Sequence, residues 1–446
     1  MPINLKEKFS APDKLKILDA PAEPKVDGMN PASELPGNVI TFHPENNSNE
    51  QQENDWRDLW KKHKDRPLNN LENVMIALRN APELKNSFAL DEMLLATVVK
   101  TSLPGSNDSI SDFKEHLIDD TDVTRVQEYL QKIGLSQIGM PVVHQAIDLR
   151  GRECAYHPVR DYLDSCVWDE KPRVGTWLST YLGAESGPYN EGVGKMFLVA
   201  MVARIYQPGC KCDYTIILEG PQGTEKSTAC KILGGRWFSD CLPEVSGKDA
   251  ALHLAGKWLI ELGEMAVASK WESASLKAFL TRLEERYRPP YGRKEILQKR
   301  QCVFVGTTNQ SVYLQDSTGG RRFWPVVIGK IDNTALTTDR DQLFAEAVKL
   351  YKSGEKWYPD SNFEKMYIQP EQEARFEADS WEEPIREFVL DKERVRVGSI
   401  LLDLGIDTAQ RSRRNEHRVT DILQRLGWRR ATKKDADGNR SWVPPV

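Results

Sequence analysis

The stretch of residues 215–228 reads TIILEGPQGTEKST. Its apolar start predicts a short buried strand, and the glycines that follow predict a turn into a helix. The stretch fits the pattern G-x-x-x-x-G-K-S/T except at Glu225, where glycine is usual. Such a loop directs successive backbone N–H groups at bound phosphates. We therefore predict a phosphate-binding loop (P-loop) with nucleotide contacts from Gly220, Pro221, Gln222, Gly223, Thr224, Glu225, Lys226, Ser227 and Thr228.

Two side chains of the P-loop carry the expected chemistry. Lys226 can reach the terminal phosphates of ATP, and the Ser227 hydroxyl can hold a Mg²⁺ ion. The helix after the loop directs its positive end at the phosphates. Glu225 is the departure, because a carboxylate beside a triphosphate is unfavourable, although its backbone N–H remains available and its side chain can point to solvent. The alternative is a strand, turn and helix without a nucleotide, which the adjacent Lys and Ser disfavour.

Composition and charge describe an ordinary globular protein. The 446 residues suffice for roughly two to four domains. The net charge of −5 gives no overall basic field, so any contact with nucleic acid must come from local patches. The seven cysteines are scattered, which predicts reduced thiols. The longest apolar run, 196–206, is short for a membrane span, so we expect a cytoplasmic protein without a membrane partner.

Sequence patterns divide the chain into four parts. Residues 1–55 are rich in Pro, Asn, Glu, Gln and Ser, which predicts a disordered leader. Apolar residues at helical spacing predict a small helical N-terminal domain over 56–155, where the sequence offers no chemistry. The P-loop domain is expected over 156–365, and a separate C-terminal domain over 380–446.

A second chemical element, KWLIELGE, occupies residues 257–264. This pattern predicts an apolar strand that ends in acidic residues. A P-loop enzyme needs one carboxylate to hold Mg²⁺ and a second to polarise the attacking water. Glu261 suits the first role and Glu264 the second. Strands often end in acids, so the assignment depends on the P-loop upstream.

A basic stretch follows a predicted amphipathic helix over 276–287. Arginines and lysines are interleaved there with tyrosines and a few acids, which suits a hairpin that touches a nucleic-acid backbone. A solvated surface explains the same charges equally well. The candidate DNA contacts are Arg288, Arg293 and Lys294.

Two further elements complete the predicted nucleotide site. A strand over 301–306 precedes Asn309, whose amide can hydrogen-bond a γ-phosphate or the attacking water. Arg321 and Arg322 lie in a glycine-rich loop before an apolar strand that runs to Ile328. Paired arginines in such a loop suit a guanidinium that acts in trans on a neighbouring subunit.

The C-terminal part predicts helices followed by a hairpin, an order that suggests a winged helix. The hairpin is expected over 428–442, where an Asp-Gly pair provides the turn. Arg414, Arg418 and Arg425 fall on the helix face opposite the apolar stripe. We favour DNA contact by these arginines over a merely solvated face.

The motifs GPQGxxKST, WLIELGE, VGTTN and GGRRFW, in this order, resemble the virulence-associated protein E family of phages and bacterial mobile elements. The resemblance covers roughly residues 155–360. The family is similar to superfamily-3 helicases, which implies an α/β, AAA+-like P-loop NTPase core with a parallel sheet and assembly into a hexameric ring. The implied roles are nucleotide and Mg²⁺ binding by Lys226 and Ser227, an acidic pair of Glu261 and Glu264 with Glu261 on the metal, a polar sensor Asn309, and an arginine finger, Arg321 or Arg322.

Two classes of function follow from these features. The first is an ATP-dependent DNA helicase or translocase that serves replication of a phage or mobile genetic element. The second is a DNA-binding replication scaffold or regulator whose nucleotide site is impaired by Glu225. A small-molecule kinase explains neither the basic C-terminal domain nor the paired arginines. Related phage proteins often carry an N-terminal primase, for which the leader here is too short, so priming is not expected.

Overall fold

The computed structural model describes residues 55–106, 112–242, 248–263, 274–288, 295–311, 313–314, 320–375, 379–432 and 441–445. The leader predicted over 1–55 lies, up to Asn54, outside the described residues. Residues Asp55–Val446 form one compact unit. Their buried apolar side chains gather in four clusters: one in the N-terminal part, one on each face of a central sheet, and one in the C-terminal part.

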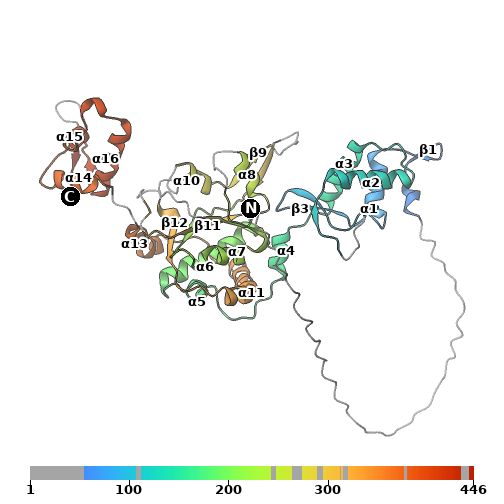
Figure 1. Ribbon diagram of the computed structural model, residues 1–446, viewed down its shortest axis with the longest axis horizontal. Helices are drawn as coiled ribbons and strands as arrows, with labels where there is room; N and C mark the ends of the chain where they lie inside the picture. The colour runs from blue at the N-terminus through green and yellow to red at the C-terminus, as the bar shows by residue number, and fades with distance from the viewer. Residues whose placement is uncertain are drawn as a thin grey trace, which may run out of the picture. The chain divides into compact units, whose positions relative to one another are not determined.

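A five-stranded parallel sheet forms the centre of the fold (Figure 1). Its neighbouring strands all pair in parallel, so their carboxyl ends lie at one edge, where ligands bind in open α/β sheets. This confirms the predicted α/β core with a parallel sheet. The strands, in spatial order, are β12 (Phe323–Val327), β6 (Thr215–Glu219), β11 (Val303–Thr308), β8 (Leu259–Leu262) and β7 (Phe238–Ser239).

Successive residues of the central strands face two different apolar clusters. On β6, Ile216 and Leu218 join the larger cluster, whereas Ile217 joins the cluster on the other face. Leu259 and Ile260 of β8 divide in the same way. Side chains alternate across a strand, so an uninterrupted apolar run is what a strand covered on both faces requires.

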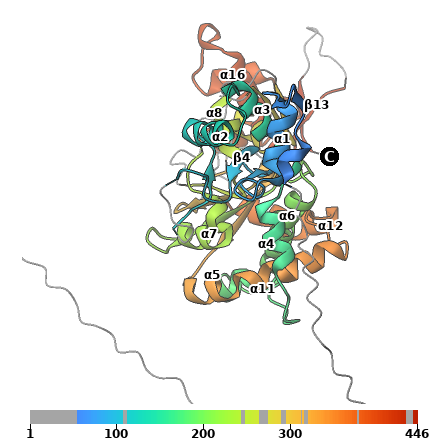
Figure 2. The same ribbon diagram turned by 90° about the vertical axis from the view of Figure 1, so that its right-hand side faces the viewer.

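Helices cover both faces of this sheet (Figure 1). In both views, α4, α6 and α11 lie side by side (Figures 1 and 2). Within the described part of the chain, no helix has the length and apolar character needed to cross a membrane. One face carries α4 (Pro158–Ser165), α5 (Trp177–Leu182), α6 (Pro188–Tyr206), α7 (Lys226–Gly234), which continues into η2 (Gly235–Trp237), and α11 (Asn333–Lys352), and the other carries α8 (Lys248–Leu254) and α10 (Ala274–Leu280).

The helix predicted over 276–287 is wrong in its second half. The helix ends with α10, and the later residues form β9 (Glu284–Tyr287), which pairs antiparallel with β10 (Ile296–Lys299). Burial alternates along β9, where Glu285 and Tyr287 are buried and their neighbours are exposed. The apolar residues of this stretch fit the spacing of a helix, whereas burial along β9 follows the two-residue period of a strand. Pairing with β10 stabilises the strand.

The N-terminal part contains the expected helices and also strands, which corrects the prediction of a purely helical domain. Strands of two to four residues are too short for alternation to reveal them in the sequence. The helices are η1 (Trp56–Leu59), α1 (Leu71–Asn80), α2 (Asp120–Lys132) and α3 (Met140–Glu153), and the strands are β1 (Lys62–His63), β2 (Arg66–Pro67), β3 (Phe88–Asp91), β4 (Ala96–Val99) and β5 (His116–Leu117).

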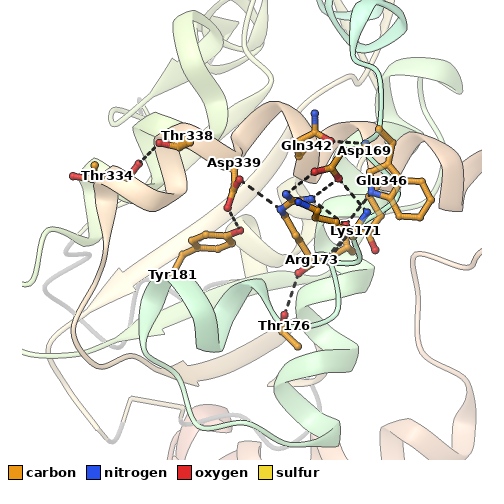
Figure 3. Close-up of polar contacts among 12 residues, drawn as sticks. Asp169, Lys171, Arg173, Thr176, Tyr181, Thr334, Thr338, Asp339, Gln342 and Glu346 are labelled. Atoms are coloured by element: carbon orange, nitrogen blue, oxygen red, sulfur yellow. Dashed lines mark hydrogen bonds and ion pairs between the residues drawn. The ribbon is translucent and has the colours of Figure 1, made fainter.

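Polar contacts join the segment between α4 and α5, residues 166–176, to α11 (Figure 3). The Glu346 carboxylate accepts hydrogen bonds from the backbone N–H groups of Arg173, at 2.6 Å, and Val174, at 2.9 Å. The Arg173 guanidinium pairs with Asp169 in the same segment and with Asp339 on α11. These contacts hold a segment that has no regular secondary structure against the helix that covers the sheet.

The C-terminal part forms helices followed by a two-stranded hairpin around its own apolar cluster. This order agrees with the sequence-based expectation, and its identity as a winged helix stays a prediction. The elements after α11 are α12 (Ser361–Phe363), the π-helix η4 (Glu364–Ile368), α13 (Gln369–Ala374), α14 (Glu382–Val389), α15 (Val397–Asp403), η5 (Thr408–Gln410), α16 (Arg413–Arg425), β13 (Arg429–Arg430) and β14 (Trp442–Val443).

Candidate functional site

The predicted P-loop connects the end of β6 to the start of α7. The backbone N–H of Gly220 donates to the carbonyl of Thr308 on β11, and a Cβ at Gly220 would lie 2.9 Å from a side-chain carbon of Ile328. Gly223 has a φ of +83°, in the left-handed region that glycine adopts without strain. Close approach and backbone conformation therefore explain both glycines.

Glu225 adopts a glycine-like backbone conformation at the position where the P-loop pattern has glycine. Its φ of 63° and ψ of 29° are left-handed, a conformation that is unfavourable by about 1–2 kcal/mol for a residue with a Cβ. The exposed Glu225 carboxylate accepts a hydrogen bond of 2.7 Å from Nδ2 of Asn333, the first residue of α11. A negative charge is stabilised at a helix N-terminus. The P-loop conformation is thus retained, and the carboxylate is bound to α11.

We expect Glu225→Gln to change the affinity for nucleotide by less than about fivefold, because interactions between exposed charges contribute about 1 kcal/mol or less. Glu225→Gly should behave similarly. Titration with a nonhydrolysable ATP analogue measures the affinity, and Asn333→Ala is the matched variant that releases the carboxylate. Tightening by about tenfold or more in Glu225→Gln, equivalent to ~1.4 kcal/mol, would show instead that the carboxylate repels the triphosphate.

Lys226 begins α7 and folds over the P-loop. Its Nζ donates to the carbonyl oxygens of Gly220, at 2.7 Å, and Pro221, at 2.8 Å. A third contact, of 3.3 Å, joins Nζ to Oγ1 of Thr224. The ammonium is therefore held within the loop, where it can exchange these neutral acceptors for charged phosphate oxygens, which bind a cation more strongly.

Ser227 and Glu261 meet at the carboxyl end of the sheet. Ser227 Oγ donates to Oε1 of Glu261 at 2.6 Å, and Thr307 Oγ1 on β11 donates to the same oxygen at 2.7 Å. Glu261 is 2% exposed, and among the described residues its Oε2 has no hydrogen-bond partner. A buried polar atom without a partner is unfavourable, and Mg²⁺ prefers oxygen ligands such as these. Ser227 and Glu261 therefore fit the Mg²⁺ ion that the sequence predicts.

These groups line a pocket of about 440 Å³, a volume within the range of about 300–1,000 Å³ for small-molecule sites. Its lining includes most of the predicted P-loop, although Gly220 and Pro221 are not part of it. The lining residues are Gln222, Gly223, Thr224, Glu225, Lys226, Ser227, Thr228, Asp240, Glu261, Gly263 and Thr307.

Asp240 and Thr307 are pocket residues that sequence reasoning missed. Asp240 is exposed and directly follows β7, a strand of two residues that gives almost no sequence signal. Thr307 is buried within β11, two residues before the predicted sensor Asn309. Asn309 itself is exposed in the bend after β11 and is not among the lining residues. Its role as a sensor stays a prediction.

The structure describes two of the three remaining predicted catalytic residues. Glu264 lies outside the described residues, so its role stays a prediction. Arg321 and Arg322 belong to the short helix η3 (Gly320–Arg322) before β12, where Arg321 is exposed and Arg322 is partly buried. Neither arginine is among the described residues that line the pocket. The action of these arginines on a neighbouring subunit stays a prediction.

Glu219, the residue before Gly220, is held in a buried ion pair. Arg375 donates from Nε and Nη2 to both carboxylate oxygens of Glu219, at 3.0–3.1 Å. Tyr313 donates its hydroxyl to Oε1 of Glu219 at 2.7 Å, and burial raises the pKa of this hydroxyl. The Arg375 carbonyl accepts hydrogen bonds from the N–H groups of Tyr313 and Leu314. The start of the P-loop is thus fixed to two segments that are remote in sequence.

We expect Arg375→Met to lower the free energy of unfolding by about 3–5 kcal/mol, because Glu219 would remain as a buried charge without its cation. Adding Glu219→Gln should recover much of this loss, since a neutral amide still accepts from Tyr313. Urea unfolding followed by tryptophan fluorescence measures both variants. Arg286, whose ion pair with Glu295 is exposed, provides the control, and Arg286→Met should cost less than about 1 kcal/mol. Unchanged stability of Arg375→Met would contradict this role.

The structure describes one of the three candidate DNA contacts beside β9. Arg288 is exposed at the end of β9, whereas Arg293 and Lys294 lie outside the described residues. Arg300, in the same basic stretch, is buried and ion-paired with the buried Glu285. A buried ion pair therefore anchors the base of the hairpin, and this arginine is not part of a solvated face.

Arg418 and Arg425, two of the three arginines predicted on the face of α16 opposite its apolar stripe, form ion pairs with acidic residues. Arg418 donates to both carboxylate oxygens of Asp379, at 2.6 and 2.7 Å. The Arg425 side chain is 17% exposed and pairs with Glu382 at 3.1 Å. Acidic residues at the start of α14 and just before it therefore occupy part of the expected basic face. Arg414 is exposed, and DNA contact stays a prediction.

Comparisons with known proteins find a family match and similar solved structures. Three solved structures of the NrS-1 C-terminal region share 11%, 13% and 14% identity with this chain, with TM-scores of 0.43, 0.41 and 0.37. Each covers 80% of this chain, and the match spans 96%, 96% and 95% of the respective solved chains. A comparison with curated proteins finds no match. Residues 163–377 match the family described as Virulence-associated protein E-like domain, so this part of the chain is a virulence-associated protein E-like domain.

Proposed function

We propose that this protein is an ATP-dependent DNA helicase or translocase that acts in replication of a phage or mobile genetic element. The observation that carries the proposal is the contact between Ser227 and Glu261 in a pocket lined by residues 222–228. It joins the hydroxyl and the carboxylate that a Mg²⁺–nucleotide complex needs. The virulence-associated protein E-like domain over residues 163–377, with motifs that resemble superfamily-3 helicases, supports the role in replication.

Binding of ATP would rest on the P-loop. Its backbone N–H groups and Lys226 would hold the phosphates, because both present positive charge to the same anion. Ser227 and Glu261 would hold the Mg²⁺ ion, which supplies a positive charge that neutralises the phosphate oxygens during transfer. Glu225, bound to Asn333, would contribute its backbone N–H without directing its carboxylate at the phosphates.

Hydrolysis would require groups that position water and stabilise charge. Glu264 would polarise the attacking water, and Asn309 would hydrogen-bond this water or the γ-phosphate. Arg321 or Arg322 from the next subunit of a hexameric ring would stabilise the phosphoryl group in the transition state. DNA would contact the basic hairpin and the C-terminal part, where Arg288 and Arg414 are exposed.

Hydrolysis of ATP measured with and without single-stranded or duplex DNA tests the proposal. We expect DNA to stimulate hydrolysis by the wild type and by Lys231→Ala, a control on the exposed part of α7. Lys226→Ala should show no hydrolysis. If the wild type binds DNA but hydrolyses no ATP, the protein is the alternative, a DNA-binding scaffold or regulator with a weak or inactive nucleotide site. Absence of both activities would refute both functions.

A further inference from the structure

The Glu261 carboxylate is supported unequally at its two oxygens. Oε1 accepts two hydrogen bonds, from Ser227 Oγ at 2.6 Å and from Thr307 Oγ1 at 2.7 Å. Oε2 is buried and has no hydrogen-bond partner among the residues that the structure describes. One oxygen is therefore fixed in place, and the other keeps its lone pairs available to a cation.

The two hydroxyl donors differ in how firmly they are held. Ser227 is exposed in the first turn of α7 and is itself a predicted metal ligand. Thr307 is 3% exposed and lies on β11, between β6 and β8 in the centre of the sheet. Val305 pairs with Glu261 across the two strands, so Thr307, two residues further along, projects from the same face. A β-branched side chain in a strand has a restricted χ1, so the Thr307 hydroxyl is a rigid donor.

We propose that Thr307 is a positioning residue for the metal site. Its hydroxyl fixes Oε1 of Glu261 and so keeps Oε2 for the Mg²⁺ ion that accompanies the nucleotide. Groups that orient metal ligands in this way contribute about 10- to 100-fold to metal affinity. The inference rests on the proposed function, because it assigns a role within the same nucleotide site.

The experiment measures metal binding without hydrolysis. Mn²⁺ serves as the probe and is titrated into the protein saturated with a nonhydrolysable ATP analogue, with bound Mn²⁺ followed by electron paramagnetic resonance. Thr307→Val keeps the shape of the side chain and removes the hydroxyl, and it should weaken Mn²⁺ binding by about 10- to 100-fold. Thr307→Ser restores the donor and should return the affinity to within about threefold of the wild type, since one hydrogen bond is re-formed.

Thr308→Val is the matched control. The neighbouring Thr308 is partly buried on the same strand, but its hydroxyl accepts a hydrogen bond from the N–H of Gln310. This variant should bind Mn²⁺ like the wild type. Affinity for the nucleotide without metal should be the same in all three variants, because Thr307 acts through Glu261 and the metal ion.

The outcomes separate this inference from the proposed function. If folded Thr307→Val, with an unchanged melting temperature, binds Mn²⁺ as tightly as the wild type, Thr307 has only a packing role and the inference is overturned. Equal weakening in Thr307→Ser and Thr307→Val would also overturn it, since the hydroxyl would then be irrelevant. A wild type that binds Mn²⁺ with nucleotide but never hydrolyses ATP would refute the proposed function and leave the Thr307 comparison intact. A wild type that binds no Mn²⁺ would refute both.

Discussion

Lys226→Ala is expected to abolish DNA-stimulated ATP hydrolysis and to weaken ATP binding by about 10- to 100-fold, since a hydrogen bond to a charged group contributes about 1.5–3 kcal/mol. The Lys226 ammonium already lies among the carbonyl oxygens of the P-loop, so it meets the phosphates in the ground state. Glu264→Gln should also abolish hydrolysis but leave ATP binding nearly unchanged. Its carboxylate acts on the attacking water, an interaction that matters mainly in the transition state.

Two assays on the same preparations distinguish these roles. Equilibrium titration with a fluorescent, nonhydrolysable ATP analogue gives the dissociation constant, and phosphate release gives the rate of hydrolysis. Lys231→Ala removes an exposed lysine from the same helix and should match the wild type in both assays. An equal loss of ATP binding in Lys226→Ala and Glu264→Gln would refute the assignment of Lys226 to ground-state binding and of Glu264 to the transition state.

Local sequence patterns predicted the parts of the site that are continuous in the chain. The apolar residues of β6, the glycine turn and Lys226 are neighbours in sequence, and each has a strong local preference. The acidic end of β8 was recognisable for the same reason. The parallel sheet itself came from the resemblance of several motifs, since a short apolar run does not reveal its pairing.

The contacts that hold the site together could not be predicted in this way, because they join residues far apart in the chain. Asn333 lies 108 residues from Glu225, and Arg375 lies 156 residues from Glu219. Only the folded sheet brings such partners together. Thr307 shows a related limit: the polar residues at the end of β11 mark the region, but the strand register decides that Thr307 reaches Glu261.

The paired arginines are expected to act across a subunit boundary. Replacing both Arg321 and Arg322 by alanine should lower the hydrolysis rate by about 10³- to 10⁵-fold while leaving ATP binding largely intact, because an arginine finger stabilises charge that develops in transfer. Neither side chain is among the described residues that line the pocket of its own chain. A subunit without the arginines should therefore still hold ATP and still offer a complete P-loop to its neighbour.

Mixing variants tests the direction of this contact. Lys226→Ala and the double variant Arg321→Ala, Arg322→Ala should each be inactive alone, yet mixed rings contain interfaces with an intact P-loop on one side and intact arginines on the other. Partial activity should return on mixing.

The matched control mixes Lys226→Ala with Glu264→Gln. Both changes damage the same half of the interface, so no mixed interface is complete and no activity should return. If the arginine variant assembles with Lys226→Ala and no mixing ratio restores hydrolysis, either the arginines act within their own subunit or every site of the ring must be intact. Equal recovery in the control mixture would show that Lys226 and Glu264 act from different subunits, so recovery on mixing would no longer identify the arginines as the groups supplied in trans.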